Sequence, residues 1–488
     1  MIRPQSNTSY DSLVPSRKRR EDPRVPPAPQ VINFPGQPSS AKPKIRDSAE
    51  LDLQIAPAKT LKEGHSFSYL ALFAFTLVLY ARPSEFYPSP VTASIALVMG
   101  ILTLAFFVPT QFALEGNISA PLPEVKILLL FAMLAVVNMP LAMSPPDAVE
   151  VFTTTFIRCV VMFIVMVNVV RTPARLKGLL FLGVGAAIWL SFAAIEDYRS
   201  GLLTVEGYRA AGRGTGIFGN TNDMALHLVT MFPIVAAAMF GSRNKLAKIA
   251  LAACGILLVA AIVLSYSRGA FIGLVVILVF FALKLGNQNR VAIILGLLMV
   301  AGAFLLFAPG GYGTRLLSIF IPSLDPVQSA DARRAELFRS LYVAIRHPFF
   351  GIGMGNYQSQ MSLRGLVTHN SYTQIASEMG LFALACYIAF MISPLRKLGQ
   401  IVRETSSERR SSRFFYLAVG VEGALIGYMI SSFFLSVPYN WYVYYLVAYA
   451  VCLRRIYESD TGRVLVVESR KERKEKRLNP SLVRTAEA

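Results

Sequence analysis

The sequence predicts an all-α, polytopic membrane helix bundle with about twelve transmembrane helices and a large periplasmic loop. Hydrophobic residues make up 54% of the 488 residues and charged residues only 16%, which is not the composition of a soluble globular protein. Apolar stretches of span length recur between residues 67 and 457, and basic residues gather in alternate connections between them. Backbone polar groups in lipid must be paired within their own segment, so these stretches are expected to be helices.

The expected spans are residues 67–81, 90–108, 125–143, 151–170, 176–195, 219–241, 247–265, 270–285, 291–308, 371–395, 414–436 and 440–457. Each is close to the roughly 20 residues that cross the hydrocarbon core.

The placement of charge predicts the orientation. The formal net charge is +19, and the basic connections are residues 171–177, 243–248, 284–290 and 396–413, together with both tails. The intervening connections are short or acidic, or are two long loops. This is the positive-inside pattern, and it places both termini in the cytoplasm. Membrane topology accounts for the charge, so no nucleic-acid partner is expected.

Three regions are expected along the chain. Residues 1–65 are rich in Pro, Ser, Arg and Lys and predict a disordered cytoplasmic extension without a cleavable signal peptide. Residues 66–457 form the membrane domain, and residues 458–488 form a basic cytoplasmic tail whose charges alternate.

The cysteines predict no chemistry. Each lies inside an expected span, and their spacing fits no metal site, so they are expected to be packing residues without a disulfide framework. They are Cys159, Cys254, Cys386 and Cys452.

Two long non-cytoplasmic loops interrupt the short connections. One covers residues 196–218, and the other covers residues 309–370, far longer than an ordinary connection. Within the second loop, residues 330–345 carry apolar side chains at helical spacing, namely Ala335, Phe338, Leu341 and Tyr342. His347-Pro348 is expected to end that helix, because the residue before a proline disfavours the helical region.

Three basic groups converge on this non-cytoplasmic face. The first runs from Arg209 through Arg213 to Asn220 and Asp223, and its glycines allow a close backbone approach before a helix N-terminus. It lacks the ending of a P-loop. Asp223 fits either a helix-start charge or a site residue.

The second group is the turn Ser265-Tyr-Ser-Arg268-Gly269, where an arginine opposes the charge rule. A phosphate-binding role and snorkelling to lipid headgroups are both open for Arg268. The third group is the long loop itself. Its basic side chains are Arg333, Arg334, Arg339, Arg346 and His369.

His369 stands where the long loop re-enters the membrane, next to Asn370. An imidazole at this boundary could take a proton from an incoming hydroxyl while arginines hold an anionic leaving group. A helix-capping role is the structural alternative. His227, inside a span, is expected to be a hydrogen-bonded packing residue instead.

The order of these motifs resembles the O-antigen ligase and polymerase superfamily of bacterial envelope membrane enzymes, over roughly residues 70 to 440. The motifs that show this resemblance are, in chain order, RGTGIFGNTND, SYSRG, RHPFFGIGMGNY in a long loop, and His369-Asn370 followed after nine residues by Gly380. Ala383 stands where the superfamily pattern has Gly, Thr or Tyr. This departure favours membership of the superfamily over assignment to the true ligases.

The resemblance implies a bacterial inner-membrane glycosyltransferase without a cofactor. It would move a glycan from an undecaprenyl-pyrophosphate carrier to an acceptor hydroxyl at the periplasmic face. The acceptor would be lipid A-core in a ligase or another lipid-linked glycan in a polymerase. We predict His369 as the general base and a metal-independent reaction. The predicted substrate-binding residues are Arg213, Arg268, Arg209, Asn220, Arg339 and Asn370.

Three ionisable residues inside spans need partners or a wet cavity, since a charge at mid-bilayer costs about 2.5–3.5 kcal/mol on insertion scales. They are Arg158, Glu378 and Glu422. Ion pairs that tie helices together are the expected explanation.

Two alternatives come from other functional classes. A secondary transporter would also have about twelve spans and cytoplasmic ends, but no half-repeat is detectable and the longest loop lies between the ninth and tenth spans. A structural scaffold would not need arginines on the disfavoured side of the membrane.

Overall fold

The computed structural model describes residues 60–203, 209–210, 218, 220–307, 329–409 and 411–465. The chain divides into Met1–Gln54 and Ile55–Ala488, and every described residue belongs to the second unit. Most of the N-terminal extension, the tail beyond residue 465 and Arg213 lie outside the described residues.

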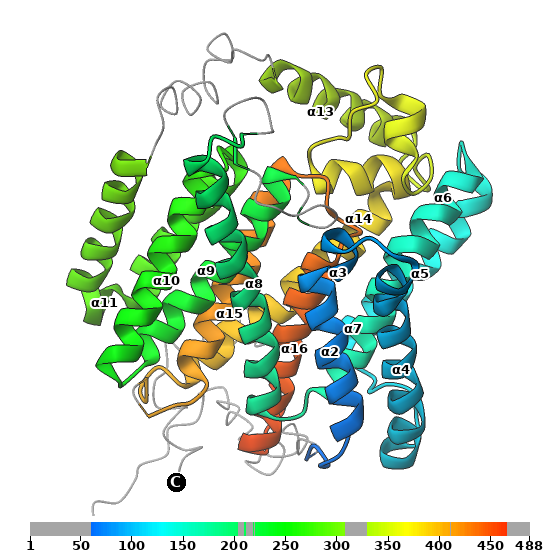
Figure 1. Ribbon diagram of the computed structural model, residues 1–488. Coiled ribbons are helices and arrows are strands. Elements are labelled where there is room, and N and C mark those ends of the chain that lie inside the picture. The colour runs from blue at the N-terminus through cyan, green and yellow to red at the C-terminus, as the bar shows by residue number, and fades with distance from the viewer. Residues whose placement is uncertain are drawn as a thin grey trace, which may run out of the picture. The chain divides into compact units, whose positions relative to one another are not determined.

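The described part of the second unit is helical, as the sequence predicts (Figure 1). In chain order the α-helices are α2 (Ser66–Ala81), α3 (Pro83–Phe86), α4 (Pro90–Glu115), α5 (Pro123–Asn138), α6 (Pro145–Val151), α7 (Ile157–Val169), α8 (Pro173–Arg199), α9 (Thr221–Gly241), α10 (Lys245–Leu264), α11 (Arg268–Phe307), α13 (Ser329–Arg346), α14 (Ser371–Glu404), α15 (Phe415–Ser431) and α16 (Trp441–Thr461). Short 3₁₀-helices are η1 (Met139–Leu141) and η6 (Ser432–Phe434), and π-helical turns are η2 (Phe152–Phe156) and η5 (Tyr357–Met361).

Ten helical stretches in the described residues are long and apolar enough to cross a membrane, and they coincide with ten of the expected spans. The expected spans 291–308 and 440–457 have no counterpart among the ten. The first lies in the second part of α11, and the second is α16. The helix α16 is rich in tyrosine and is buried along most of its length among α7, α14 and α15, although its composition is less apolar.

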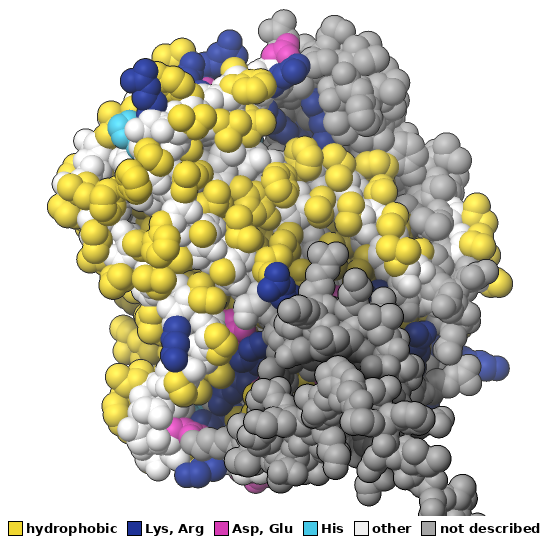
Figure 2. All heavy atoms as spheres, turned by 180° about the vertical axis from the view of Figure 1, so that it is seen from behind, with side chains coloured by type: hydrophobic (Ala, Val, Ile, Leu, Met, Phe, Trp, Pro, Cys, Tyr) yellow, Lys and Arg dark blue, Asp and Glu magenta, His cyan; other side chains and the backbone are white. Residues whose placement is uncertain are grey.

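The exposed surface agrees with a membrane-spanning bundle. On the face in Figure 2, hydrophobic side chains form a band between two ends where lysines and arginines gather. The helix α4 contributes to such a surface, since residues such as Val91, Leu97 and Ile101 are exposed. A lipid-facing helix exposes apolar residues because the hydrocarbon around it is equally apolar.

Small residues set the packing of α15. A Cβ placed on Gly427 would lie 2.7 Å from Cδ1 of Ile277 in α11, and one on Gly423 would lie 2.9 Å from Cβ of Pro233 in α9. Helices in lipid associate through close van der Waals packing, which small residues permit. The glycines therefore bring α9 and α11 against α15.

The intramembrane charges divide into three cases. Glu422 accepts a hydrogen bond from Nζ of Lys284 at 2.8 Å, so the prediction of a helix-tying ion pair is confirmed there. The prediction of an ion pair is wrong for Glu378, whose carboxylate accepts hydrogen bonds from uncharged donors. Arg158 is exposed and has no carboxylate within ion-pair distance in the described part of the chain.

The packing residues behave largely as expected. Cys159, Cys386 and Cys452 are buried free thiols, and Cys254 is a half-buried one. Nε2 of His227 lies 3.0 Å from the carbonyl oxygen of Gly183, as a hydrogen-bonded packing histidine would.

The helix expected at residues 330–345 is α13, and it ends before His347-Pro348 as predicted. The apolar side chains at helical spacing would be expected to face the interior of the protein, but the orientation of α13 is different. Phe338 is 60% exposed and Tyr342 is 55% exposed, whereas Glu336 and Ser340 are buried. The polar residues face inward because they make hydrogen bonds to the rest of the loop and to α14. In Figure 1, α13 lies at one end of the bundle, near the start of α14.

Candidate functional site

The turn between α10 and α11 presents Arg268 at the first position of α11. Tyr266 adopts φ 52°, a left-handed conformation that is unfavourable for a bulky residue, and Ser267 N donates to Oγ of Ser265 at 3.2 Å. Arg268 itself is only 8% exposed. Strained backbone of this kind concentrates at functional sites.

Arg209 is joined to this turn. Its Nε donates to the carbonyl oxygen of Ser265 at 2.9 Å, and its Nη2 donates to Oδ1 of Asn222 in α9 at 2.9 Å. Ala210 N also donates to the carbonyl oxygen of Leu264 at 3.2 Å. The structure therefore brings Arg209 and Arg268 together, although they are 59 positions apart, and two donor groups of Arg209 are already engaged in holding the turn.

Two expected substrate-binding residues act as helix caps. Oδ1 of Asn220 accepts from Asn222 N at 2.8 Å at the start of α9. Oδ1 of Asn370 accepts from the backbone N of Tyr372 and Thr373, at 2.9 and 3.0 Å, at the start of α14. Such caps satisfy backbone donors that a helix start leaves open.

His369 immediately precedes the cap of α14 and adopts φ 53°. Burial, with a smaller contribution from the charge of Arg333 in α13, lowers the pKa of His369 to about 4. The imidazole is therefore neutral at physiological pH, the form that accepts a proton. No hydrogen bond to the ring is present among the described residues, and its helix is capped by Asn370 instead. The helix cap is therefore Asn370 and not His369.

The helix α13 fastens the long loop to α14. Oγ of Ser340 donates to Oγ1 of Thr373 at 2.9 Å. The buried carboxylate of Glu336 accepts from the hydroxyl of Tyr357 at 2.8 Å and from Nη1 of Arg339 at 3.4 Å. Arg339 is thus paired within its own helix, while Arg333 is the loop arginine that acts electrostatically on His369.

Gly380 marks a break in α14 where the loop folds in. Its φ is 86°, and a Cβ there would lie 2.3 Å from the carbonyl oxygen of Phe349. The turn that contacts this break runs through Gly351 and Gly353, whose backbone N donates to the carbonyl oxygen of Glu378 at 2.8 Å. Only a glycine meets both the conformation and the close approach at residue 380.

The carboxylate of Glu378 stabilises the same contact. It accepts from the hydroxyl of Tyr439 at 2.8 Å, from Tyr357 N at 3.3 Å and from Nε2 of Gln374 at 3.4 Å. None of these donors is His369, so Glu378 does not orient the imidazole.

The segment from Ser431 to Trp441, between α15 and α16, links the parts of the site. Oγ of Ser431 donates to the carbonyl oxygen of Gly269 at 3.3 Å. On its other side, Oγ of Ser436 lies 2.9 Å from Oγ1 of Thr368, and Oγ of Ser371 donates to the carbonyl oxygen of Leu435 at 2.7 Å. The turn that carries Arg268 and the helix start that carries His369 therefore pack on one segment.

Sequence reasoning did not select this segment or Arg333. The segment carries no motif, and its only signal is an unusually short connection rich in serine and aromatic residues. Arg333 was one of several loop arginines, and spacing alone does not tell which of them approaches His369. Among the described residues, no group of three or more His, Cys, Asp or Glu side chains could hold a metal ion.

Comparison with known proteins identifies one family. Residues 252–388 match the sequence model of the O-antigen ligase family, Wzy_C. The matched range begins in α10 and contains Arg268, α13, His369 and Gly380. No curated protein matches the chain.

Proposed function

We propose that this multi-pass membrane protein, whose residues 252–388 match the O-antigen ligase family, is an O-antigen ligase-like glycosyltransferase that transfers a glycan from undecaprenyl pyrophosphate to an acceptor hydroxyl on the periplasmic side. The observation that supports this proposal is the shared packing of the Arg268 turn and the His369 helix start on the segment from Ser431 to Trp441. In this proposal Arg268 is the phosphate-binding group and His369 the proton acceptor, and both belong to elements that pack on this one segment.

The donor supplies its own activation, because diphosphate is a good leaving group. The acceptor oxygen forms a bond to the anomeric carbon, and the bond from that carbon to the diphosphate oxygen breaks with its electron pair. The acceptor proton passes to the neutral imidazole of His369. No metal is required in this scheme, because the arginines neutralise the leaving diphosphate.

The arginines take different roles in this proposal. Arg268 and Arg213 contact the diphosphate, since a guanidinium matches phosphate oxygens with paired donors. Arg209 positions the turn and the start of α9 through its bonds to Ser265 and Asn222. Asn220 and Asn370 fix the helix starts that frame the site.

Ala383 does not argue against the reaction. Its side chain is fully buried in α14, so the departure from the superfamily pattern lies in the packing and not at the site. A polymerase would use the same chemistry with a second lipid-linked glycan as acceptor.

The test is a transfer assay in membrane vesicles with an undecaprenyl-pyrophosphate-linked glycan as donor. His369→Ala is expected to lower the rate by about 10²–10⁴, the usual contribution of general-base catalysis. His347→Ala is the matched control, because His347 lies in the same loop but is exposed. A wild-type rate of transfer by the His369→Gln protein would exclude His369 as the general base. Transfer only to a second lipid-linked glycan would identify the protein as a polymerase.

A further inference from the structure

A cleft of about 540 Å³ lies on the lipid-facing side of the bundle, between α2, α4, α7 and the start of α16. Its apolar walls include Phe75 from α2, Ile101 and Leu104 from α4, and Met162 from α7. Leu97 and Ile101 are 61% and 58% exposed, so the cleft opens toward the bilayer. Leu79 and Gly100 complete the wall between α2 and α4.

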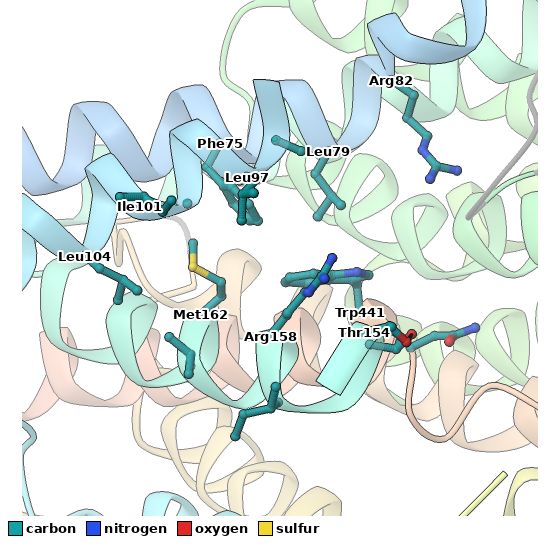
Figure 3. Close-up of a pocket in the computed structure, with 16 residues that line it drawn as sticks. Phe75, Leu79, Arg82, Leu97, Ile101, Leu104, Thr154, Arg158, Met162 and Trp441 are labelled. Carbon is teal, nitrogen blue, oxygen red and sulfur yellow. Dashed lines mark hydrogen bonds between the residues drawn. The ribbon is translucent and has the colours of Figure 1, made fainter. Parts of the chain in front are cut away.

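The cleft has a polar end and an apolar end. Figure 3 shows Arg158 extending into it beside Trp441, with Arg82 and Thr154 toward the same end, while Ile101, Leu104 and Met162 lie at the other. This gradient matches an amphiphile with a compact polar head and a long apolar tail.

Arg158 supplies the positive charge at the polar end of the cleft. Arg82 pairs with Glu85 at 2.6 Å, whereas Arg158 is exposed and makes no ion pair to a carboxylate in the described ranges. An uncompensated cation within a membrane span is costly, and such residues mark substrate or ion sites. An anionic headgroup would compensate it.

The backbone next to Arg158 is irregular. Residues Phe152–Phe156 form the π-helical turn η2, which directs Thr154 and Thr155 to the cleft. Such turns inside helices are frequent at functional sites.

The polar end of the cleft adjoins the site described above. Trp441 and Asn440 line it, and the preceding residue, Tyr439, donates to Glu378 at 2.8 Å. These residues belong to the segment from Ser431 to Trp441 that contacts the His369 helix start and the Arg268 turn. An occupant with its head at Arg158 would therefore lie next to the site, unlike a lipid of the general bilayer.

We propose that this cleft binds the polyprenyl chain of the lipid-linked substrate, with Arg158 contacting its phosphate groups as the carrier enters and before Arg268 and Arg213 contact the diphosphate for transfer. The inference rests on the proposed function and adds to it the path by which the carrier enters from the bilayer. Arg158 is a binding residue in this proposal, and His369 remains the base.

The experiment uses the full-length protein in vesicles, with a photoreactive residue in place of Ile101 and radiolabelled undecaprenyl pyrophosphate as probe. Crosslinking is expected at residue 101 but not at Ile249, which is 67% exposed on α10 and lies outside the cleft. Adding Arg158→Gln should lower crosslinking of the pyrophosphate probe roughly tenfold, as loss of a charge-assisted phosphate contact predicts. Crosslinking of the neutral undecaprenol should change little.

Three outcomes would overturn the inference. They are equal crosslinking at residues 101 and 249, no effect of Arg158→Gln on the pyrophosphate probe, and displacement of the probe by excess phosphatidylglycerol, which would identify an ordinary phospholipid site. The His369→Ala protein separates this inference from the proposed function, since it should crosslink normally while transfer is lost. Wild-type protein that crosslinks without transferring glycan would contradict the function alone, and one that transfers without crosslinking would contradict the cleft alone.

Discussion

The backbone of Gly380 in α14 passes so close to the carbonyl oxygen of Phe349 that a Cβ on Gly380 would lie 2.3 Å from it. Leu381 N donates to the carbonyl oxygen of Pro348 at 2.7 Å in the same contact. The break in α14 and the loop turn are therefore one structural unit, in which Gly380 permits the close packing of the two backbones.

Gly380→Ala is expected to destabilise the protein, because alanine meets both a left-handed backbone and a backbone oxygen. A strained conformation of this kind costs on the order of 1–3 kcal/mol, before the clash is added. Thermal unfolding in detergent would measure the effect, and transfer should fall with it. Gly185→Ala is the control, since a Cβ there meets nothing within 4 Å. Equal stability of the two variants would contradict the packing role.

The pH dependence follows from the lowered pKa of His369, about 4. The base should stay neutral down to about pH 5, so the acid limb of kcat/KM assigned to His369 should lie near 4 instead of the usual 6.5. The unfolded chain takes up this proton below about pH 6.5 and the folded chain does not, so this residue reduces stability as pH falls from 6.5 toward 4.

Arg333→Gln provides the complementary test, because the charge of Arg333 contributes to that lowered pKa. The acid limb should move toward higher pH, although only in part, since burial is the larger cause. Arg334→Gln is the matched control, because Arg334 is the next residue of α13 and is exposed, whereas Arg333 is half-buried. An acid limb near 6.5 in the wild-type protein, unmoved by Arg333→Gln, would show that another group controls the profile.

Arg213→Ala and Arg268→Ala are each expected to abolish transfer without loss of the protein from the membrane. Lysine should restore activity only in part, because it lacks the paired donors of a guanidinium. Arg209→Lys should also impair transfer, since one ammonium on a shorter group does not reproduce both the Ser265 and the Asn222 bonds. Transfer rates normalised to membrane protein would decide this, and full activity of both alanine variants would refute the diphosphate contact.

The orientation can be tested with reporter fusions. Alkaline phosphatase fused after Gln328 should be active, because the loop is expected in the periplasm, and a fusion after Thr405 should be silent. Reversed activities would invert the topology and move the proposed site to the cytoplasmic face.

The sequence by itself determined the membrane fold and most span boundaries. Apolar length and alternating basic loops are local properties, and lipid leaves a backbone little choice except a helix. The helix at residues 330–345 and its end at His347-Pro348 were also predictable, since periodicity and proline act over a few residues.

The tertiary structure decided which residues meet. Arg209 reaches Ser265, Glu336 reaches Tyr357, and the segment from Ser431 to Trp441 joins the Arg268 turn to the His369 helix start. These partners are far apart along the chain, and no spacing rule relates them. The same reason explains why Glu422 has a cation and Glu378 does not, because a partner depends on which helix faces the carboxylate, which packing alone determines.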